Sequence, residues 1–326
     1  MRSSKPIWKT VPMAHDTINV LHLLNTSLPL VNGYGLRSHA MLTALAADGV
    51  ENHVLTSPFH PGRSELTMTS CIDGINYARC PHPLDDNCGS IVDRLARPAG
   101  RIRLGRQGSV TEGNRNRRQA SGRTGDALLK SKQRLRLGAL GVEQAVLVRR
   151  FARTALPLAH SQHCQIIHAH SPARIFKAAH RVAKACGLPV VYEARGMQEA
   201  TAVAESRIAA NDPLIRRWRD AETQAMNLAQ HVIVLGEAMR AEVMCRGISG
   251  DKITVVANGC NPAAPIDDST VAVQSASRFL QQNGALAVGL VGSIQRLEGV
   301  LELIEAVAHL KNSGVPVRLL LVGSTR

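Results

Sequence analysis

The sequence predicts an α/β fold made of two units, of which the second is incomplete. One pattern, an apolar strand followed by a glycine-containing loop and an amphipathic helix, begins at Ile18 and again at Ala287. The predicted strands are short apolar runs without polar alternation, which is typical of a parallel sheet covered by helices on both faces. Two such units predict a ligand between them. The chain ends at Arg326, soon after its last predicted strand, so we expect much of the second unit to be absent.

The first unit begins with a strand at 18–24 and a helix from residue 35 to about residue 48, which Gly49 ends. Two short strands follow, and a helical pattern returns at about 135–160. A regular alternation then resumes. The remaining predicted strands of the first unit are 54–56, 75–78, 166–169, 190–192, 231–235 and 253–256, and its remaining predicted helices are 173–186, about 214–228 and 237–245.

The second unit follows a polar segment between Pro262 and Ser277, where we place the interdomain linker. A strand at 287–292, a helix from about residue 299 and a strand at 317–322 come after it. The predicted organisation is a disordered N-terminus at 1–16, a first domain at 17–262, and a linker with the first part of a second domain at 263–326.

The net charge of +14 comes from one stretch of the chain. Residues 94–153 hold sixteen lysines and arginines against three acidic residues, a net charge of +13, so the rest is near neutral. Within and before this stretch, residues 84–132 lack a clear period and are rich in arginine, glycine, serine and asparagine. This composition predicts a basic insertion that is disordered or loosely helical.

The composition also bounds the class of protein. With 44% hydrophobic and 20% charged residues the chain is globular, and no apolar run approaches the ~18 residues of a membrane helix. The seven cysteines are scattered without a Cys-x-x-Cys pair, which indicates reduced thiols. The first sixteen residues lack the apolar core of a signal peptide. We therefore expect a cytoplasmic protein.

The loop from Asn32 to Arg37 lies between a predicted strand and a helix and carries two glycines. Free backbone N–H groups at a helix start can hold a phosphate, and glycine allows its close approach. Gly33, Tyr34, Gly35 and Arg37 are therefore candidate phosphate-binding residues, although a tight turn without a ligand explains the same pattern. The spacing differs from Gly-x-Gly-x-x-Gly, which disfavours a nicotinamide cofactor.

Two other strand ends carry polar side chains. His168 and His170 would share one face of their strand, but no third ligand stands at a recognisable spacing, so no metal site is predicted. His170 is a candidate hydrogen-bond donor at the carboxyl edge of the sheet, and His168 a satisfied core histidine. The next strand end holds Glu193, Arg195 and Glu199, which either line the same site or form a solvated loop.

Asn258 and Gly259 follow another strand, where a structural turn is the favoured interpretation. The chain contains no Asp-x-Asp, no Gly-x-Ser-x-Gly and no Walker loop. A metal-chelated nucleotide-sugar site of the Asp-x-Asp type is therefore not predicted, and neither a metal nor another cofactor is expected.

These segments, in this order, resemble family 4 retaining glycosyltransferases of the GT-B fold. The resemblance covers 18–56 and 166–323, and rests on His-Ala-His-Ser at 168–171, on 251–259, and on Val291-Gly292-Ser293 with Glu298-Gly299. The run at 27–37, together with Val-Tyr-Glu-x-Arg at 191–195, resembles the branch associated with exosortase and exopolysaccharide gene clusters.

The resemblance implies two Rossmann-like domains, the first binding the acceptor and the second the nucleotide-sugar. Gly33 to Gly35 would face the donor diphosphate, with His170 near the sugar or the diphosphate. The second domain's phosphate loop would hold Ser293, Arg296 and Glu298, and Asn258 and Gly259 join the donor-binding candidates. Two glutamates that the family carries later in this domain have no counterpart before Arg326, so we expect poor donor binding and a truncated, inactive enzyme as one outcome.

The function so implied is hexosyl transfer from a nucleotide-diphosphate sugar to a lipid-linked or polysaccharide acceptor, in exopolysaccharide or cell-surface glycan synthesis. The candidate catalytic residues are His170, Glu193, Arg195 and Glu199. The alternative is a protein that binds nucleic acid or anionic membrane through 94–153. That stretch has one aromatic residue, Phe151, and so offers little base stacking. A solvated insertion is favoured over peripheral contact with the inner membrane face, and that contact over nucleic acid.

Overall fold

A computed structural model of the chain describes residues 17–60, 68–82, 124–259, 274–275, 277–279 and 284–323. These residues form two compact units, Met1–Gly196 with Ala221–Ala257, and Met197–Asp220 with Asn258–Arg326. The predicted N-terminal tail at 1–16, most of the basic insertion at 84–132 and most of the linker at 263–277 lie outside the described residues.

The first unit is built on an eight-stranded sheet whose central strand is β1 (Ile18–Leu24). The strand order is β3-β4-β2-β1-β5-β6-β7-β8, and all neighbours are parallel except β3 and β4. This architecture confirms the predicted α/β class with a mainly parallel sheet. The other strands are β2 (Val50–Thr56), β3 (Thr69–Ile72), β4 (Ile75–Arg79), β5 (Ile166–His170), β6 (Val190–Ala194), β7 (His231–Val234) and β8 (Ile253–Val255).

The chain reverses its direction of travel across the sheet between β1 and β5. After β1 it moves outward to β2 and β4, then returns through a long helix to β5 on the other side of β1. In open parallel sheets, ligands bind at such a switch point, beyond the carboxyl ends of the strands. The switch point brings the loop after β1 and the end of β5 to the same edge of the sheet.

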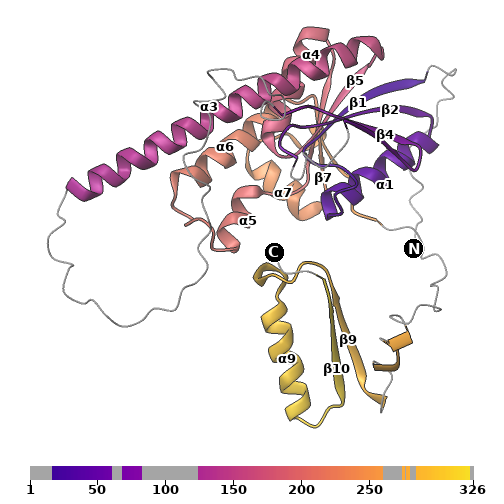
Figure 1. Cartoon of the computed structure of the whole chain (residues 1–326), viewed down its shortest axis with the longest axis vertical. Helices are drawn as coiled ribbons and strands as arrows, with labels where there is room; N and C mark the ends of the chain where they lie inside the picture. The colour runs from indigo at the N-terminus through magenta and orange to yellow at the C-terminus, as the bar shows by residue number, and fades with distance from the viewer. Residues whose placement is uncertain are drawn as a thin grey trace. The chain divides into compact units, whose positions relative to one another are not determined.

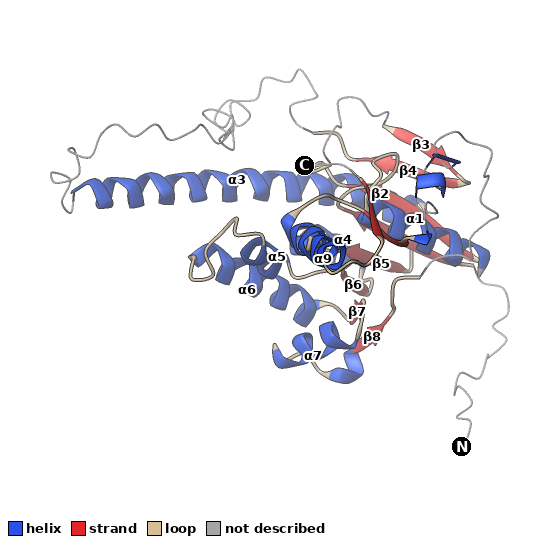
Figure 2. Cartoon of the chain, turned by 90° about the horizontal axis from the view of Figure 1, so that it is seen from below, coloured by secondary structure: helices blue, strands red, loops and turns tan. Residues whose placement is uncertain are grey.

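Helices cover both faces of the sheet (Figure 1). α1 (Gly33–Ala47) packs against β2 and β4, whereas α4 (Ala173–Cys186) packs against β5, β6 and β1. α3 (Thr124–Ser161) runs alongside α4 (Figure 2). The sequence predicted that this helix begins near residue 135. In the structure it begins at Thr124, so residues 124–132, the last part of the predicted insertion, are helical. Two further helices are α6 (Pro213–Leu228) and α7 (Glu237–Cys245).

The strands with continuous apolar sequences are the buried ones. Leu21, Leu23 and Leu24 of β1 are fully buried because both faces of this central strand are covered. β3 was not predicted, since its sequence Thr-Ser-Cys-Ile is polar and it lies at the edge of the sheet. The short helix α5 (Gln198–Ala204) was also missed.

The described part of the second unit contains a two-stranded parallel sheet of β9 (Leu286–Val291) and β10 (Val317–Val322). α9 (Val300–Asn312) packs against β10 and buries Val300 and Val307. These elements match the predicted strand, helix and strand. Among the described residues of both units, no helix is long and apolar enough to cross a bilayer.

A buried carboxylate joins three elements of the first unit. Glu222 of α6 is 4% exposed and accepts hydrogen bonds from the backbone N–H of Ala173 at 2.7 Å and from the Tyr192 hydroxyl. It therefore supplies an acceptor at the start of α4 and at the middle of β6.

We predict that Glu222→Ala lowers the free energy of unfolding by about 2–3 kcal/mol, because two buried donors lose this acceptor. Urea unfolding followed by circular dichroism measures the change. Gln224→Ala, at an exposed position of the same helix, serves as the control and should be close to neutral. Equal stability of the Glu222 variant and the parent would contradict the prediction.

Candidate functional site

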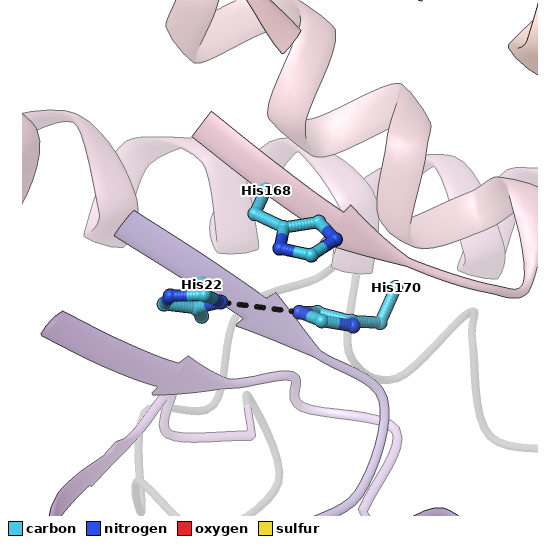
Figure 3. Close-up of side chains that lie close together, drawn as sticks. All are labelled: His22, His168 and His170. Carbon is cyan, nitrogen blue, oxygen red and sulfur yellow. Dashed lines mark hydrogen bonds between the residues drawn. The ribbon is translucent and has the colours of Figure 1, made fainter. Parts of the chain in front are cut away.

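Three histidines meet at the switch point between β1 and β5 (Figure 3). His22 of β1 is paired in register with His168 of β5, and His170 lies two residues further along the same face. His22 Nδ1 is 3.3 Å from His170 Nε2, and the ring centroids of His168 and His170 are 4.1 Å apart. His22 was not predicted, although it is the one ionisable residue in an otherwise mostly apolar strand.

Glu193, at the next strand end, is the centre of a buried polar network. It is paired with His170 in the register of β5 and β6, and it is 1% exposed. Its Oε2 accepts from His170 Nδ1 at 2.5 Å and from Arg195 Nε at 2.7 Å. Its Oε1 accepts from Arg37 Nε at 2.8 Å. The alternative of a solvated loop for Glu193 is therefore wrong.

The two arginines also hold the protein backbone around the site. Arg195 Nη1 donates to Tyr34 O at 3.0 Å and to Ser38 Oγ at 2.7 Å, with its guanidinium 4.3 Å from the centre of the Tyr34 ring. Arg37 donates to Val256 O at 3.0 Å and to Ala257 O at 3.3 Å. Through them, Glu193 connects the first turn of α1 to the ends of β6 and β8.

The network determines the ionisation of its members. Burial alone raises the pKa of the Glu193 carboxyl, but the hydrogen bond from His170 and the charge of Arg195 outweigh it and hold this pKa well below its usual range. Burial, assisted by Arg195, lowers the pKa of His170 to about 3. Two guanidinium groups against one carboxylate leave the site with one net positive charge while the imidazoles are neutral.

The hydrogen bonds also assign the imidazole tautomers. The Asn52 amide nitrogen donates to Leu42 O and Val50 O, both at 3.1 Å, so its oxygen accepts from His22 Nε2 at 2.9 Å. His22 thus carries its proton on Nε2. His170 Nδ1 lies 2.5 Å from Glu193 Oε2 and 2.8 Å from Arg195 Nη2. Because the carboxylate can only accept, we assign the proton of His170 to Nδ1. In the neutral pair, the two inner nitrogens direct lone pairs at each other.

The third histidine is packed differently. His168 is buried, and its Nε2 has no hydrogen-bond partner among the described residues. The prediction of a satisfied core histidine is therefore wrong in this respect. Burial, with the neighbouring His170, lowers the pKa of His168 well below its usual value.

The three histidines are metal ligands by type, and the structure supplies the third ligand that the sequence spacing did not show. Their ligand atoms lie within 4.8 Å of one another. Zinc–nitrogen bonds of about 2.0–2.1 Å place tetrahedral ligands roughly 3.3 Å apart, a separation that the His22–His170 pair has. The net positive charge contributed by Arg37 and Arg195 disfavours a cation, so we assign no metal.

The two glycines in the first turn of α1 serve different purposes. Asn32 caps the helix, its Oδ1 accepting from Gly35 N at 2.7 Å. A Cβ at Gly35 would lie 2.8 Å from Leu30 O, whereas a Cβ at Gly33 would have nothing within 4 Å. Gly35 therefore permits the chain to fold against itself. At Gly33 the space beside the helix start is open to a ligand.

The remaining predicted site residues belong to the second unit. Glu199 is buried in α5, and Asn258 and Gly259 are exposed after β8. Ser293 is half-buried, while Arg296 and Glu298 are exposed in a single 3-10 turn before α9. The catalytic role of Glu199 and the assignment of the other residues to donor binding stay predictions.

We predict that Gly35→Ala lowers the free energy of unfolding by about 1–3 kcal/mol, because the new methyl group overlaps the Leu30 carbonyl. Gly33→Ala is the matched control, two residues away in the same turn, and should change stability little. Chemical denaturation of both variants measures the difference. Equal effects would show that the close approach at Gly35 is not a constraint.

The buried histidines make the stability of the fold depend on pH. Because burial lowers the pKa of His22, His168 and His170 in the folded state, the unfolded chain binds more protons once the pH falls below the unfolded pKa of about 6.5. The free energy of unfolding is therefore highest above that pH and decreases as the pH falls. The contribution of His170 to this decrease ends near its folded-state pKa of about 3. Each imidazole contributes at most about 1.4 kcal/mol per pH unit.

His168→Leu should flatten this dependence, since it removes one titrating group, whose Nε2 has no hydrogen-bond partner among the described residues. Urea unfolding at pH 7.5, 6.5 and 5.5 tests the slope, with His163→Asn at an exposed position as the control. A slope equal to that of the parent would show that His168 does not contribute to the pH dependence of stability. Glu193 acts in a lower window, because its stabilising charge is lost only as the pH falls below its unfolded pKa of about 4.3.

Comparison with known proteins gives a family match over part of the chain. The family model for Glycosyltransferase Family 4 matches residues 132–264, which include β5, His168, His170, Glu193 and Arg195. No curated protein matches this sequence.

Solved structures resemble the fold at low identity. Alr3699/HepE of Anabaena, in complex with UDP and glucose, matches with a TM-score of 0.52 and 15% identity, over 95% of this chain and 62% of that one. The apo form of the lipopolysaccharide outer core galactosyltransferase WaaB has a TM-score of 0.44 and 10% identity, over 94% and 68%. UDP-GlcNAc 2-epimerase of Methanocaldococcus jannaschii has a TM-score of 0.44 and 9% identity, over 93% and 65%.

This chain therefore spans less than two thirds of the length of HepE. The likeness at these identities concerns the fold. Residues 132–264 match the Glycosyltransferase Family 4 model, and the mixed α/β fold with its parallel sheet is similar to that of HepE.

Proposed function

We propose that the protein is a glycosyltransferase that transfers a sugar from a nucleotide-diphosphate donor, with the diphosphate lying at the start of α1. The observation that supports this proposal is the Glu193 network. It holds two guanidinium groups and a buried histidine directly behind the helix start, at the edge of the sheet where α/β proteins bind ligands.

The chemistry requires stabilisation of negative charge. As the sugar leaves, charge grows on the diphosphate, and preorganised donors aimed at that charge lower the barrier, each typically by a factor of about 10²–10³. The open space at Gly33 and the helix N-terminus offer such donors. The net positive charge of the network adds a field of the right sign.

Arg37 and Arg195 act in this proposal as positioning residues. Each directs its N–H groups at Glu193 and at backbone or side-chain oxygens of the protein. They hold α1 in place and keep the site positively charged. Glu193 is the carboxylate that fixes both.

His170 is proposed to contact the sugar or the diphosphate. Both of its ring nitrogens are engaged, Nδ1 with Glu193 and Nε2 with His22. Because Nε2 is the unprotonated nitrogen of this tautomer, donor binding would exchange the His22 contact for a hydrogen bond accepted from a sugar hydroxyl. Glu199 is a further proposed catalytic group. Asn258, Gly259, Ser293, Arg296 and Glu298 are proposed to bind the donor from the second unit.

The finer assignment is also part of the proposal. It comprises a retaining reaction without a metal cofactor, a lipid-linked or polysaccharide acceptor, and a role in exopolysaccharide or cell-surface glycan synthesis at the inner face of the membrane. HepE was solved with UDP and glucose, so uridine nucleotides are the first donors to examine. Contact of the basic insertion at 84–132 with anionic lipid is proposed as well.

We predict that His170→Ala reduces sugar transfer at least tenfold, with His163→Asn as the control. Transfer from UDP-glucose to a lipid-linked acceptor is measured by release of UDP. Unchanged turnover would remove His170 from the site.

Calorimetric titration with UDP and GDP measures nucleotide binding by the chain, independently of turnover. Gly33→Ala should weaken nucleotide binding because its methyl group occupies the space at the helix start, whereas stability remains near that of the parent. Nucleotide binding that is indifferent to this variant would place the diphosphate elsewhere.

A further inference from the structure

A further cationic side chain lies at the carboxyl edge of the sheet, outside the Glu193 network. Arg174 stands in the first turn of α4, directly after β5. Its Nε and Nη2 donate to the side-chain oxygen of Asn25, which follows β1, at 3.3 and 3.0 Å. Its guanidinium lies 4.7 Å from the centre of the Phe59 ring, which belongs to the segment after β2. Segments that follow three neighbouring strands therefore meet at this side chain.

The charge of Arg174 is not compensated by a contacting carboxylate. Among the described residues, its hydrogen bonds reach only the neutral Asn25 amide, and it forms no ion pair. Burial lowers the pKa of Arg174, although Tyr34 and Glu222 nearby oppose this shift. Glu222 itself accepts hydrogen bonds from two other donors. A half-buried guanidinium that contacts no carboxylate favours an anion from outside the protein.

Arg174 and Asn25 also retain N–H donors for such an anion. Because the Asn25 side-chain oxygen faces the guanidinium, its Nδ2 is on the other branch of the amide, and no described residue accepts from it. Nη1 of Arg174 likewise has no acceptor among the described residues. The backbone of Asn25 is fixed on both sides, because its N–H donates to the Tyr34 hydroxyl at 3.0 Å and its carbonyl accepts from Ser57 Oγ at 2.9 Å. Fixed N–H donors of this kind suit the oxygens of a carboxylate or a phosphate.

We propose that Arg174 and Asn25 bind an anionic group, a carboxylate or a phosphate, on the sugar acceptor. This inference rests on the proposed transfer reaction, in which the donor diphosphate lies at the helix start beside Gly33. Phe59, which is half-buried, offers an aromatic surface to a sugar ring in the same place. The acceptor class is therefore an acidic sugar or a sugar phosphate rather than a neutral glycan.

Tyr34 separates this anion site from the place proposed for the donor. Its ring centre is 4.3 Å from the Arg195 guanidinium, and its hydroxyl accepts from the backbone of Asn25. Two cationic centres thus adjoin one tyrosine, Arg195 with a carboxylate partner and Arg174 without one. A transfer reaction brings two substrates together, and Arg174 supplies the second of them with a cation of its own.

Calorimetric titration of the full chain tests the proposal with methyl glucuronide, which carries a carboxylate, and with glucose 1-phosphate. Glucose is the neutral probe, and excess UDP is present throughout so that the helix start is occupied. We expect anion binding and no binding of glucose, and the anion that binds more tightly identifies the acceptor chemistry. If neither anion binds more tightly than glucose, the proposal is wrong.

Two variants examine the residues themselves. Arg174→Gln should weaken anion binding about tenfold or more, because it removes a hydrogen bond to a charged group. Asn25→Asp is nearly isosteric and places a carboxylate against Arg174, so it should weaken anion binding to a similar degree. Circular dichroism verifies that both variants keep the fold.

Arg181→Gln is the matched control, because Arg181 is an exposed residue of the same helix and its loss makes the same change in net charge. Its anion affinity should stay within about twofold of the parent, since salt screens an exposed charge. Equal losses in Arg174→Gln and Arg181→Gln would overturn the proposal, because net charge would then account for both.

Titration with UDP alone distinguishes the anion site from the donor site. The UDP affinity of Arg174→Gln should equal that of the parent. A loss of UDP affinity as large as the loss of anion affinity would assign Arg174 to the diphosphate and overturn the proposal. Anion binding by a chain that binds no UDP would instead count against the proposed transfer reaction alone.

Discussion

The arrangement around β1, β5 and β6 depends on one buried carboxylate. Glu193 is almost fully buried, a position in which an isolated charge is strongly unfavourable. It is tolerated because Arg37, Arg195 and His170 reach it from three different elements. Removing one partner of such a group leaves the others with uncompensated charge, which costs more than the pair contributes. The carboxylate therefore dictates where the first turn of α1 and the end of β6 lie.

Burial keeps the imidazoles of the histidine cluster neutral, and the same network assists it. The carboxylate charge is shared between two guanidinium groups, so little is left to stabilise an imidazolium. Asn52 and Glu193 then determine which nitrogen of His22 and of His170 carries the proton. Polar groups that would be unfavourable separately satisfy one another, apart from His168, whose Nε2 has no partner among the described residues.

Much of the fold could be predicted from the sequence because its strands are buried on both faces. Continuous apolar runs such as 18–24 and 317–322 correspond to observed strands, and Gly187 ends α4 as expected in the left-handed conformation. β3 escaped prediction because an edge strand exposed to water need not be apolar. The helix before Ser161 begins earlier than expected because residues 124–132 hold only two large apolar residues, which are adjacent and so show no helical period.

The site was only partly predictable for a related reason. Sequence order shows which residues end a strand, so His170, Glu193 and Arg195 were found together. It does not show which strands become neighbours, and the placement of β1 beside β5 alone brings His22 to the cluster. The sequence left open whether Gly35 serves a tight turn or a ligand, because a close approach between two backbone segments resembles a ligand-binding glycine; the structure shows that close approach.

The contact of Arg37 with Val256 and Ala257 has a wider consequence. Ala257 is the last residue of the first unit, so the polypeptide departs from it at the two carbonyls that this side chain grips. Arg37 also belongs to the first turns of the helix that opens beside Gly33. One side chain therefore anchors the point at which the polypeptide leaves the first unit to the helix that opens beside Gly33, and the same side chain pairs with Glu193.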